Sequence, residues 1–97
     1  GDSQSGSWVE VSCPYPCTRV RLYINNFSPN TSNVKIATAN NGLKLASKSS
    51  ELSTGWVEFN LSREVCRIRI RETSGYGVDL GEIEMYAKKL ESHSHSI

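Results

Sequence analysis

The sequence predicts an all-β domain built from two packed antiparallel sheets. Apolar and polar residues alternate with a period of two through most of the chain, which is the pattern of strands buried on one face only. The intervening segments are rich in Asn, Ser, Gly and Pro, which favour turns. No segment has an amphipathic helical period of useful length, and 97 residues suffice for one domain but not two. Short strands with one wet face each therefore predict a β-sandwich.

Each predicted strand is marked by apolar residues at every second position. In chain order the alternating residues are Val9 and Val11, Val20 to Ile24, Val34 and Ile36, Leu43 and Leu45, Val57 to Leu61, Ile68 and Ile70, and Ile83 to Ala87. Asn41-Gly42 between two of these segments predicts a hairpin. The residues predicted to be buried include Val20, Leu22, Val57, Phe59, Ile68, Ile70, Ile83 and Met85.

The two halves of the chain resemble each other. Each contains Trp-Val-Glu followed by an apolar residue, then a turn, then a Cys that precedes an alternating Arg and aliphatic strand. Two copies are too few for a solenoid but suit two similar hairpins in a sandwich. We predict that residues 1–7 are a linker or tag remnant, that 8–90 form the sandwich and that 91–97 are a flexible tail.

Composition excludes several classes of partner. The net charge is +1, from 11 basic and 10 acidic residues. A general nucleic-acid binder needs a surplus of cations, and so does a polybasic membrane anchor. No apolar run approaches the roughly 18 residues of a membrane span.

The three cysteines allow at most one bridge within the chain. Cys17 and Cys66 occupy equivalent places in the two halves, each just before an Arg and aliphatic strand, so we predict a Cys17–Cys66 disulfide with Cys13 free. A Cys13–Cys17 bridge is the alternative, although two prolines stiffen the residues between them. No second cysteine pair or flanking histidine completes a zinc site.

Three sequons favour a secreted, extracellular protein. They begin at Asn26, Asn30 and Asn60, and we predict glycosylation at these positions.

Two stretches of the chain resemble discoidin domains, also called coagulation factor V/VIII C-type domains. The first is Trp8-Val-Glu-Val, a short turn and Thr18-Arg-Val-Arg-Leu-Tyr23; the second is Cys66-Arg-Ile-Arg-Ile-Arg71, a Ser-Gly-Tyr-Gly loop and Leu80-Gly-Glu-Ile-Glu-Met-Tyr86. The resemblance covers about residues 8–86 and implies a galactose-binding-like jelly roll. The N-terminal portion of the family, with its ligand-contacting loops, has no counterpart here.

The resemblance also bears on metal binding. Discoidin-like jelly rolls often hold a structural Ca²⁺, with oxygen ligands from the missing N-terminal loop and from the Glu that matches Glu82. Glu82 and the nearby Asp79 cannot supply the 6–8 oxygens that Ca²⁺ needs. We therefore predict no metal or other cofactor, and a solvated or ion-paired Glu82.

Nothing in the sequence predicts an enzyme. The only histidines, His93 and His95, stand in a Ser-rich tail, where neither is held beside a nucleophile. Alternation directs Glu82 and Glu84 outward from a strand, away from any shared acid–base site.

Five arginines are predicted to face outward. If their two strands share a sheet, Arg19, Arg21, Arg67, Arg69 and Arg71 line one surface. Arginine forks suit carboxylate, sulfate or phosphate, so an acidic glycan or a phospholipid headgroup is one interpretation. The near-zero net charge favours the other, a cross-strand ladder of ion pairs with Glu10, Glu58, Glu82 and Glu84.

Two loop aromatics are the remaining candidates for ligand binding. Phe27 and Tyr76 stand in loops that also hold hydrogen-bonding residues and Gly or Pro. We predict ring stacking of a saccharide on Phe27 or Tyr76, with Asn26 and Arg71 as polar partners. The alternative is that both rings cap the core.

These features together predict a non-catalytic module that recognises a carbohydrate or cell-surface ligand through loops at one end of the sandwich. The alternatives are an intracellular protein–protein interaction or assembly domain of the same fold, and a structural spacer without a ligand.

Overall fold

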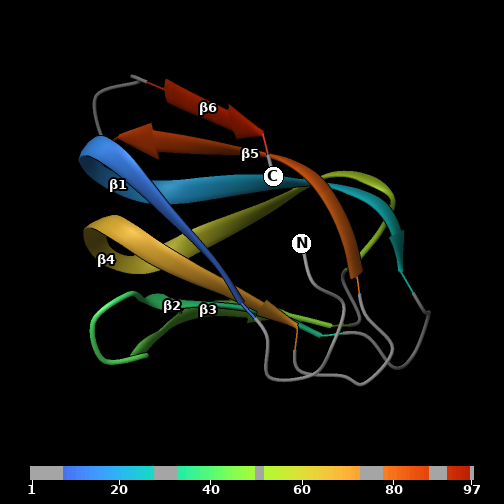
Figure 1. The fold of residues 1–97 in the computed structure, drawn as a ribbon, viewed down its shortest axis with the longest axis horizontal. Coiled ribbons are helices and arrows are strands. Elements are labelled where there is room, and N and C mark those ends of the chain that lie inside the picture. The colour runs from blue at the N-terminus through green and yellow to red at the C-terminus, as the bar shows by residue number, and fades with distance from the viewer. Residues whose placement is uncertain (1–7, 28–32, 50–51, 73–77, 88–91, 97) are drawn as a thin grey trace.

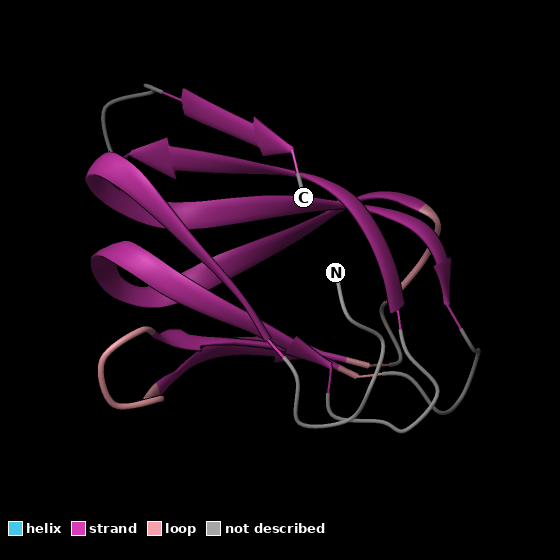
Figure 2. Cartoon of the chain, in the orientation of Figure 1, coloured by secondary structure: helices cyan, strands magenta, loops and turns pink. Residues whose placement is uncertain are grey.

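A computed structural model describes residues 8–27, 33–49, 52–72, 78–87 and 92–96, and it confirms an all-β fold. The strands are β1 (Trp8–Phe27), β2 (Val34–Thr38), β3 (Lys44–Lys48), β4 (Gly55–Glu72), β5 (Val78–Ala87) and β6 (Ser92–Ser96). No helix occurs in these ranges, as Figure 2 shows. Residues 1–7, predicted to be a linker or tag remnant, lie outside the described residues.

The strands form one continuous antiparallel sheet in the order β3-β2-β4-β1-β5-β6. The sequence predicted two separate sheets. The structure has one instead, because β1 and β4 each continue through a segment that was predicted to be a turn. Trp8–Ser12 pairs with residues 67–71, and residues 19–24 pair with 55–60. Both strands bend sharply between these regions, so the sheet folds over on itself (Figure 1).

Two names follow from this bend. The lower half comprises β3, β2, residues 67–72 of β4 and residues 8–12 of β1. The upper half comprises residues 55–60 of β4, residues 19–27 of β1, β5 and β6. The halves face each other in Figure 1, with β2 and β3 at the bottom and β5 and β6 at the top.

The core fills the space between the two halves. All eight residues predicted to be buried are so, which confirms the faces that the alternation assigned: Val20, Leu22, Val57, Phe59, Ile68, Ile70, Ile83 and Met85. Val11, Ile24, Val34 and Ile36 belong to the same cluster. Each half contributes one apolar face, so neither buries its core residues without the other.

The predicted hairpin joins β2 to β3. Gly42 has φ +69°, in the left-handed region that favours glycine. The Thr38 N–H donates to the Leu43 carbonyl at 2.9 Å, and the Leu43 N–H donates to the Thr38 hydroxyl at 2.9 Å. The turn is therefore closed by both backbone and side chain of Thr38.

The segment predicted to be a flexible tail contains a strand instead. β6 pairs with Glu82–Tyr86 of β5, although its Ser and His residues give no apolar pattern. The edge of β5 offers backbone donors and acceptors that any sequence without proline can pair with.

Candidate functional site

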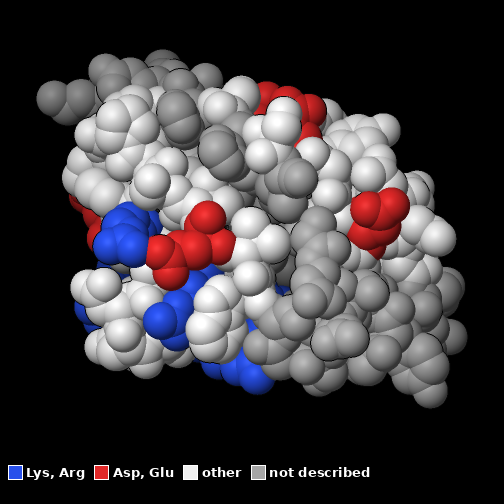
Figure 3. Space-filling model, in the orientation of Figure 1, with Lys and Arg blue, Asp and Glu red and all other residues white. Residues whose placement is uncertain are grey.

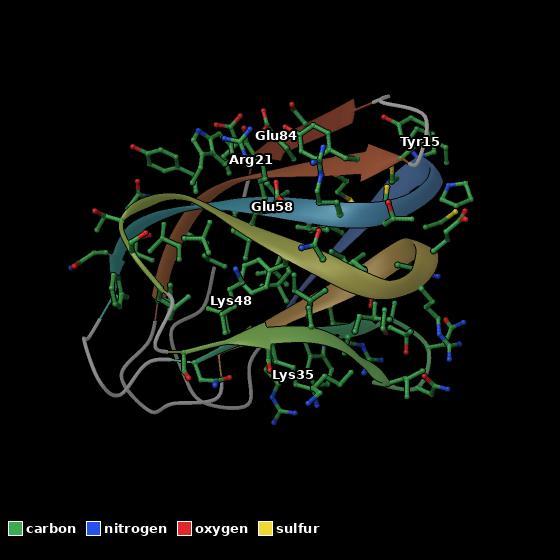
Figure 4. All side chains as sticks on the ribbon, turned by 180° about the vertical axis from the view of Figure 1, so that it is seen from behind. Tyr15, Arg21, Lys35, Lys48, Glu58 and Glu84 are labelled. Atoms are coloured by element: carbon green, nitrogen blue, oxygen red, sulfur yellow. The ribbon has the colours of Figure 1, made fainter. Side chains whose placement is uncertain are left out.

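Alternation along β1 and β4 places the arginines on the outer surfaces, in two groups rather than one. Arg19 and Arg21 lie on the upper half, and Arg67, Arg69 and Arg71 lie on the lower half. In Figure 4, Arg21 and Glu84 lie on one outer surface and Lys35 of the lower half lies on the opposite one. The strands do share a sheet, but the five guanidinium groups do not line one surface because the sheet folds between the two groups.

The upper patch, defined by Arg19, Arg21, Tyr23, Trp56, Glu58, Glu84 and Tyr86, is an ion-pair ladder with aromatic neighbours. Arg19 pairs with Glu58 at 3.7 Å, and Arg21 pairs with Glu84 at 3.2 Å. The Arg21 guanidinium also lies over the Trp56 ring, 4.6 Å from its centroid, and donates to the Tyr86 hydroxyl at 3.2 Å. The ladder interpretation is thus confirmed here, and each arginine of the patch has a carboxylate.

The lower half carries a different arrangement around Trp8. Trp8 and Lys35 are both direct cross-strand partners of Arg71, so the three residues form one row across β1, β4 and β2. In the next row Arg69 stands between Glu10 and Ala37. Trp8 is 47% exposed, and the guanidinium carbons of Arg69 and Arg71 lie 4.4 and 5.7 Å from the centroid of its ring.

These residues surround a small recess, which we call the Trp8 recess. It has a volume of about 40 Å³ and is lined by Trp8, Lys35, Ala37, Gly42, Arg69 and Arg71. That volume is on the order of one water molecule's share of the liquid, about 30 Å³. The recess therefore admits a small polar group, while a larger ring has room only on the exposed indole.

Positive charge exceeds negative charge at this recess. Glu10 pairs with both Arg67 and Arg69, the latter at 3.9 Å. Among the described side chains, no carboxylate lies within ion-pair distance of Lys35 or Arg71. The Nε atoms of Arg69 and Arg71 are buried without a hydrogen-bond partner in that same part of the chain. Lys and Arg side chains gather at the lower left of the face in Figure 3, with acidic side chains beside them.

The predicted loop site is only partly described. Asn26 is exposed at the end of β1, where its side-chain oxygen accepts a hydrogen bond from the Phe27 N–H at 3.0 Å. Phe27 is half-buried and packs against the core. Tyr76 lies outside the described residues, and Arg71 contacts Trp8. Ring stacking at Phe27 or Tyr76 stays a prediction.

The three cysteines are free thiols in the structure, so the predicted Cys17–Cys66 disulfide is absent. Cys17 is fully buried in the bend of β1 and Cys66 is exposed. Cys17 pairs with Val65 across the strands, so the neighbouring Cys66 side chain has the opposite facing. The Cys17 thiol instead donates to the Tyr15 carbonyl at 3.4 Å, and Cys13 is its buried neighbour.

Among the described residues, no three His, Cys, Asp or Glu side chains are grouped to hold a metal ion. On β5, Asp79 is exposed and Glu82 is half-buried, and the side chains of His93 and His95 lie outside the described residues. The described residues include no helix that is long and apolar enough to cross a membrane.

Two of the three sequon asparagines can be located. Asn26 and Asn60 are both exposed, as glycosylation requires, and Asn30 lies outside the described residues. Asn60 lies on the upper half, away from the Trp8 recess.

A second, wider hollow lies where β4 bends past the β2–β3 turn. It has a volume of about 260 Å³ and is lined by Thr38, Ala39, Asn40, Val65, Cys66 and Arg67. It holds no exposed aromatic ring and its one arginine already pairs with Glu10. The Trp8 recess is therefore the better candidate site.

Sequence reasoning missed Trp8 and Lys35 as site residues. In the sequence, Trp8 only begins the first stretch that resembles discoidin domains, and Lys35 is only a polar residue between Val34 and Ile36. Alternation did place Lys35 on an outer face. What brings it beside Arg71 and Trp8 is the register of three strands that are far apart in sequence.

Comparison with protein-family models, with curated proteins and with solved structures gives no match for this chain. The resemblance to discoidin domains stays a prediction.

Proposed function

We propose that this chain is a non-catalytic binding module that takes a carbohydrate or another cell-surface ligand at the Trp8 recess. The observation that carries the proposal is a tryptophan, Trp8, that is 47% exposed beside a recess lined by cationic side chains. The C–H face of a sugar ring packs on an exposed aromatic ring, while nearby N–H groups donate to its oxygens. The Lys35 ammonium and the Arg71 guanidinium, which pair with no described carboxylate, suit that second role.

The predicted loop residues take a secondary place in this proposal. Phe27 is partly buried against the core. The Trp8 ring instead contacts two guanidinium groups and remains open to solvent. Asn26 and Phe27 are proposed to line a separate region at the end of β1, and substitution there should affect binding less than at Trp8. Tyr76 stays a candidate for ring stacking from the sequence alone.

The finer fold assignment belongs to the same proposal. We infer that the two halves of the sheet act as the layers of a shortened discoidin-like jelly roll. In support, the two stretches that resemble discoidin domains lie side by side, with Val20 and Leu22 of β1 opposite Met85 and Ile83 of β5.

Secretion is part of the proposal, and the exposed Asn26 and Asn60 support it. The alternative is an intracellular protein–protein interaction domain, and the three free thiols favour it. Expression in a secretory host separates the two, because glycans on Asn26 or Asn60 favour secretion and free thiols in protein from its native source favour the alternative.

A saccharide array probed with the purified domain tests the function. We expect binding that weakens about tenfold or more in Trp8→Ala, which corresponds to losing one stacking aromatic. Tyr23→Ala is the matched control, since Tyr23 is an exposed aromatic on the upper patch. A blank array, or equal losses in the two variants, contradicts the proposal.

A further inference from the structure

The Trp8 recess differs from the upper patch in how its charges are balanced. In the upper patch, Arg19 and Arg21 each have a carboxylate of their own. In the β1, β2 and β4 parts of the lower half, Lys35, Arg67, Arg69 and Arg71 face the single described carboxylate of Glu10, which leaves three positive charges over. Cations on adjacent strands repel one another. Binding of an anion from outside the chain relieves this repulsion.

The surplus is concentrated in one row. Glu10 stands in the row of Arg69 and pairs with Arg69 and Arg67, whereas the row of Trp8, Arg71 and Lys35 has no described carboxylate. Lys35 and Arg71 are directly opposite each other, so their side chains point outward from adjacent strands. Two cations so placed can bind the oxygens of one carboxylate or sulfate group between them.

The Trp8 ring orients one of these cations. The Arg71 guanidinium carbon lies 5.7 Å from the centroid of the Trp8 ring. Contact with an aromatic ring uses the guanidinium face and leaves its in-plane N–H groups available for an anion. Because the Arg71 Nε is buried, an anion would meet the terminal N–H groups of that guanidinium.

The size of the recess indicates which part of a ligand can enter it and which part must stay outside. A volume of about 40 Å³ is too small for a pyranose, whose natural place is the exposed Trp8 side chain beside it, and it admits only an oxygen of the acidic group. A ligand that fits both parts carries its charge on a substituent next to a flat C–H face.

We propose that the ligand of the Trp8 recess is an acidic saccharide, with its carboxylate or sulfate bound by Lys35 and Arg71 and its ring packed on Trp8. This inference rests on the proposed function and names its substrate class. An acidic ligand also explains why Arg71 and Lys35 lie side by side without a described carboxylate in a chain whose net charge is only +1.

Direct binding measurements with matched probes test the proposal. The probes are a galacturonate oligomer, the same oligomer reduced to neutral galactose, a sulfated heparin-derived oligosaccharide and duplex DNA of similar charge. We expect either acidic saccharide to bind about tenfold or more tightly than the neutral one. The preference should shrink as NaCl rises from about 50 to about 300 mM. Comparing the uronate with the sulfated probe identifies the preferred acid.

Variants assign the effect to the recess. Lys35→Gln and Arg71→Gln should each abolish most of the preference for acid. Arg63→Gln, which removes an exposed cation from the bend of β4, should leave it unchanged. Thermal unfolding of each variant checks that the fold is retained.

The outcomes separate the two proposals. Equal binding of acidic and neutral oligomers, with loss in Trp8→Ala, overturns the acidic ligand and leaves the proposed function standing. Equal loss in Arg63→Gln, or DNA binding that is as tight and insensitive to Trp8→Ala, shows general polyanion attraction and also overturns it. No saccharide binding by any form contradicts the proposed function itself.

Discussion

The Cys17 side chain is the most deeply enclosed titratable group described in this chain. It lies in the bend of β1 with no exposed surface, next to the buried Cys13. Burial raises the pKa of the Cys17 thiol far above its ordinary value, and a hydrogen bond with Cys13 and the charges of Cys13 and Cys66 raise this pKa further. At alkaline pH the folded protein therefore keeps the Cys17 thiol protonated, whereas the same thiol in the unfolded chain loses its proton.

This difference predicts a loss of stability at alkaline pH. A thiol whose folded-state pKa is raised contributes its full stability below the unfolded pKa, about 8.5, and loses it as pH rises further. The slope for one proton is about 1.4 kcal/mol per pH unit. Urea unfolding of wild type and Cys17→Ala between about pH 7 and 10 measures it, and the variant should lack this slope. Parallel curves for the two proteins would contradict the prediction.

At the scale of the elements, period two predicts the strand faces correctly but not where β1 and β4 end. The sequence predicted a turn after Trp8-Val-Glu-Val, where Pro14 and Pro16 stand, and proline donates no hydrogen bond to a sheet. In the structure both prolines are exposed in β1, where the register with β4 shifts between Ser12 and Cys17. The bulge accommodates them, and a single strand continues through it.

The candidate site was harder to predict than the core for a related reason. Burial of Phe59 or Ile83 follows from alternation within one segment. The row of Trp8, Arg71 and Lys35 depends instead on which strands are neighbours and in what register. Hydrophobic alternation along one strand contains no information about either.

The edge strand β3 carries an inward-facing lysine. Lys48 pairs with the buried Val34, is half-buried, and holds its ammonium 5.5 Å from the centroid of the Phe59 ring. Figure 4 shows Lys48 pointing between the halves of the sheet, away from Lys35. A charge on the inner face of an edge strand hinders another chain from extending the sheet.

Removing that charge should therefore promote association. We expect Lys48→Leu to aggregate faster on warming than wild type, without a loss of folding stability that would explain it. Lys44→Leu is the control, because it removes the same charge from the same edge strand at an exposed position. Light scattering and size-exclusion chromatography measure the aggregation of each variant, compared at equal fractions of folded protein. Equal aggregation of both variants shows that position is unimportant.

At the scale of the whole molecule, the net charge of +1 conceals an uneven distribution. The upper patch neutralises its own arginines, whereas the lower half has six described Lys and Arg side chains and one described carboxylate, that of Glu10. The composition argued against a general nucleic-acid binder, and it says nothing of a local anion site. Only the fold in the sheet separates the two groups of arginines.

The same fold predicts that the molecule unfolds as one unit. Both halves bury their apolar faces in a single cluster, and Phe59 and Ile68 from the two ends of β4 belong to it. A small domain gains too little from either half alone to compensate for the lost chain entropy. Phe59→Leu should therefore destabilise both halves equally, by about 1–2 kcal/mol.

The two tryptophans allow the halves to be followed separately. Trp8 lies on the lower half and Trp56 on the upper half, so Trp56→Phe and Trp8→Phe each leave one fluorescent reporter. In urea, each single-tryptophan protein should give the same midpoint by fluorescence as by circular dichroism. Adding Phe59→Leu should lower both midpoints by the same amount, because the lost contacts belong to the shared core. A reporter whose transition precedes the other, or that ignores Phe59→Leu, indicates that its half opens independently.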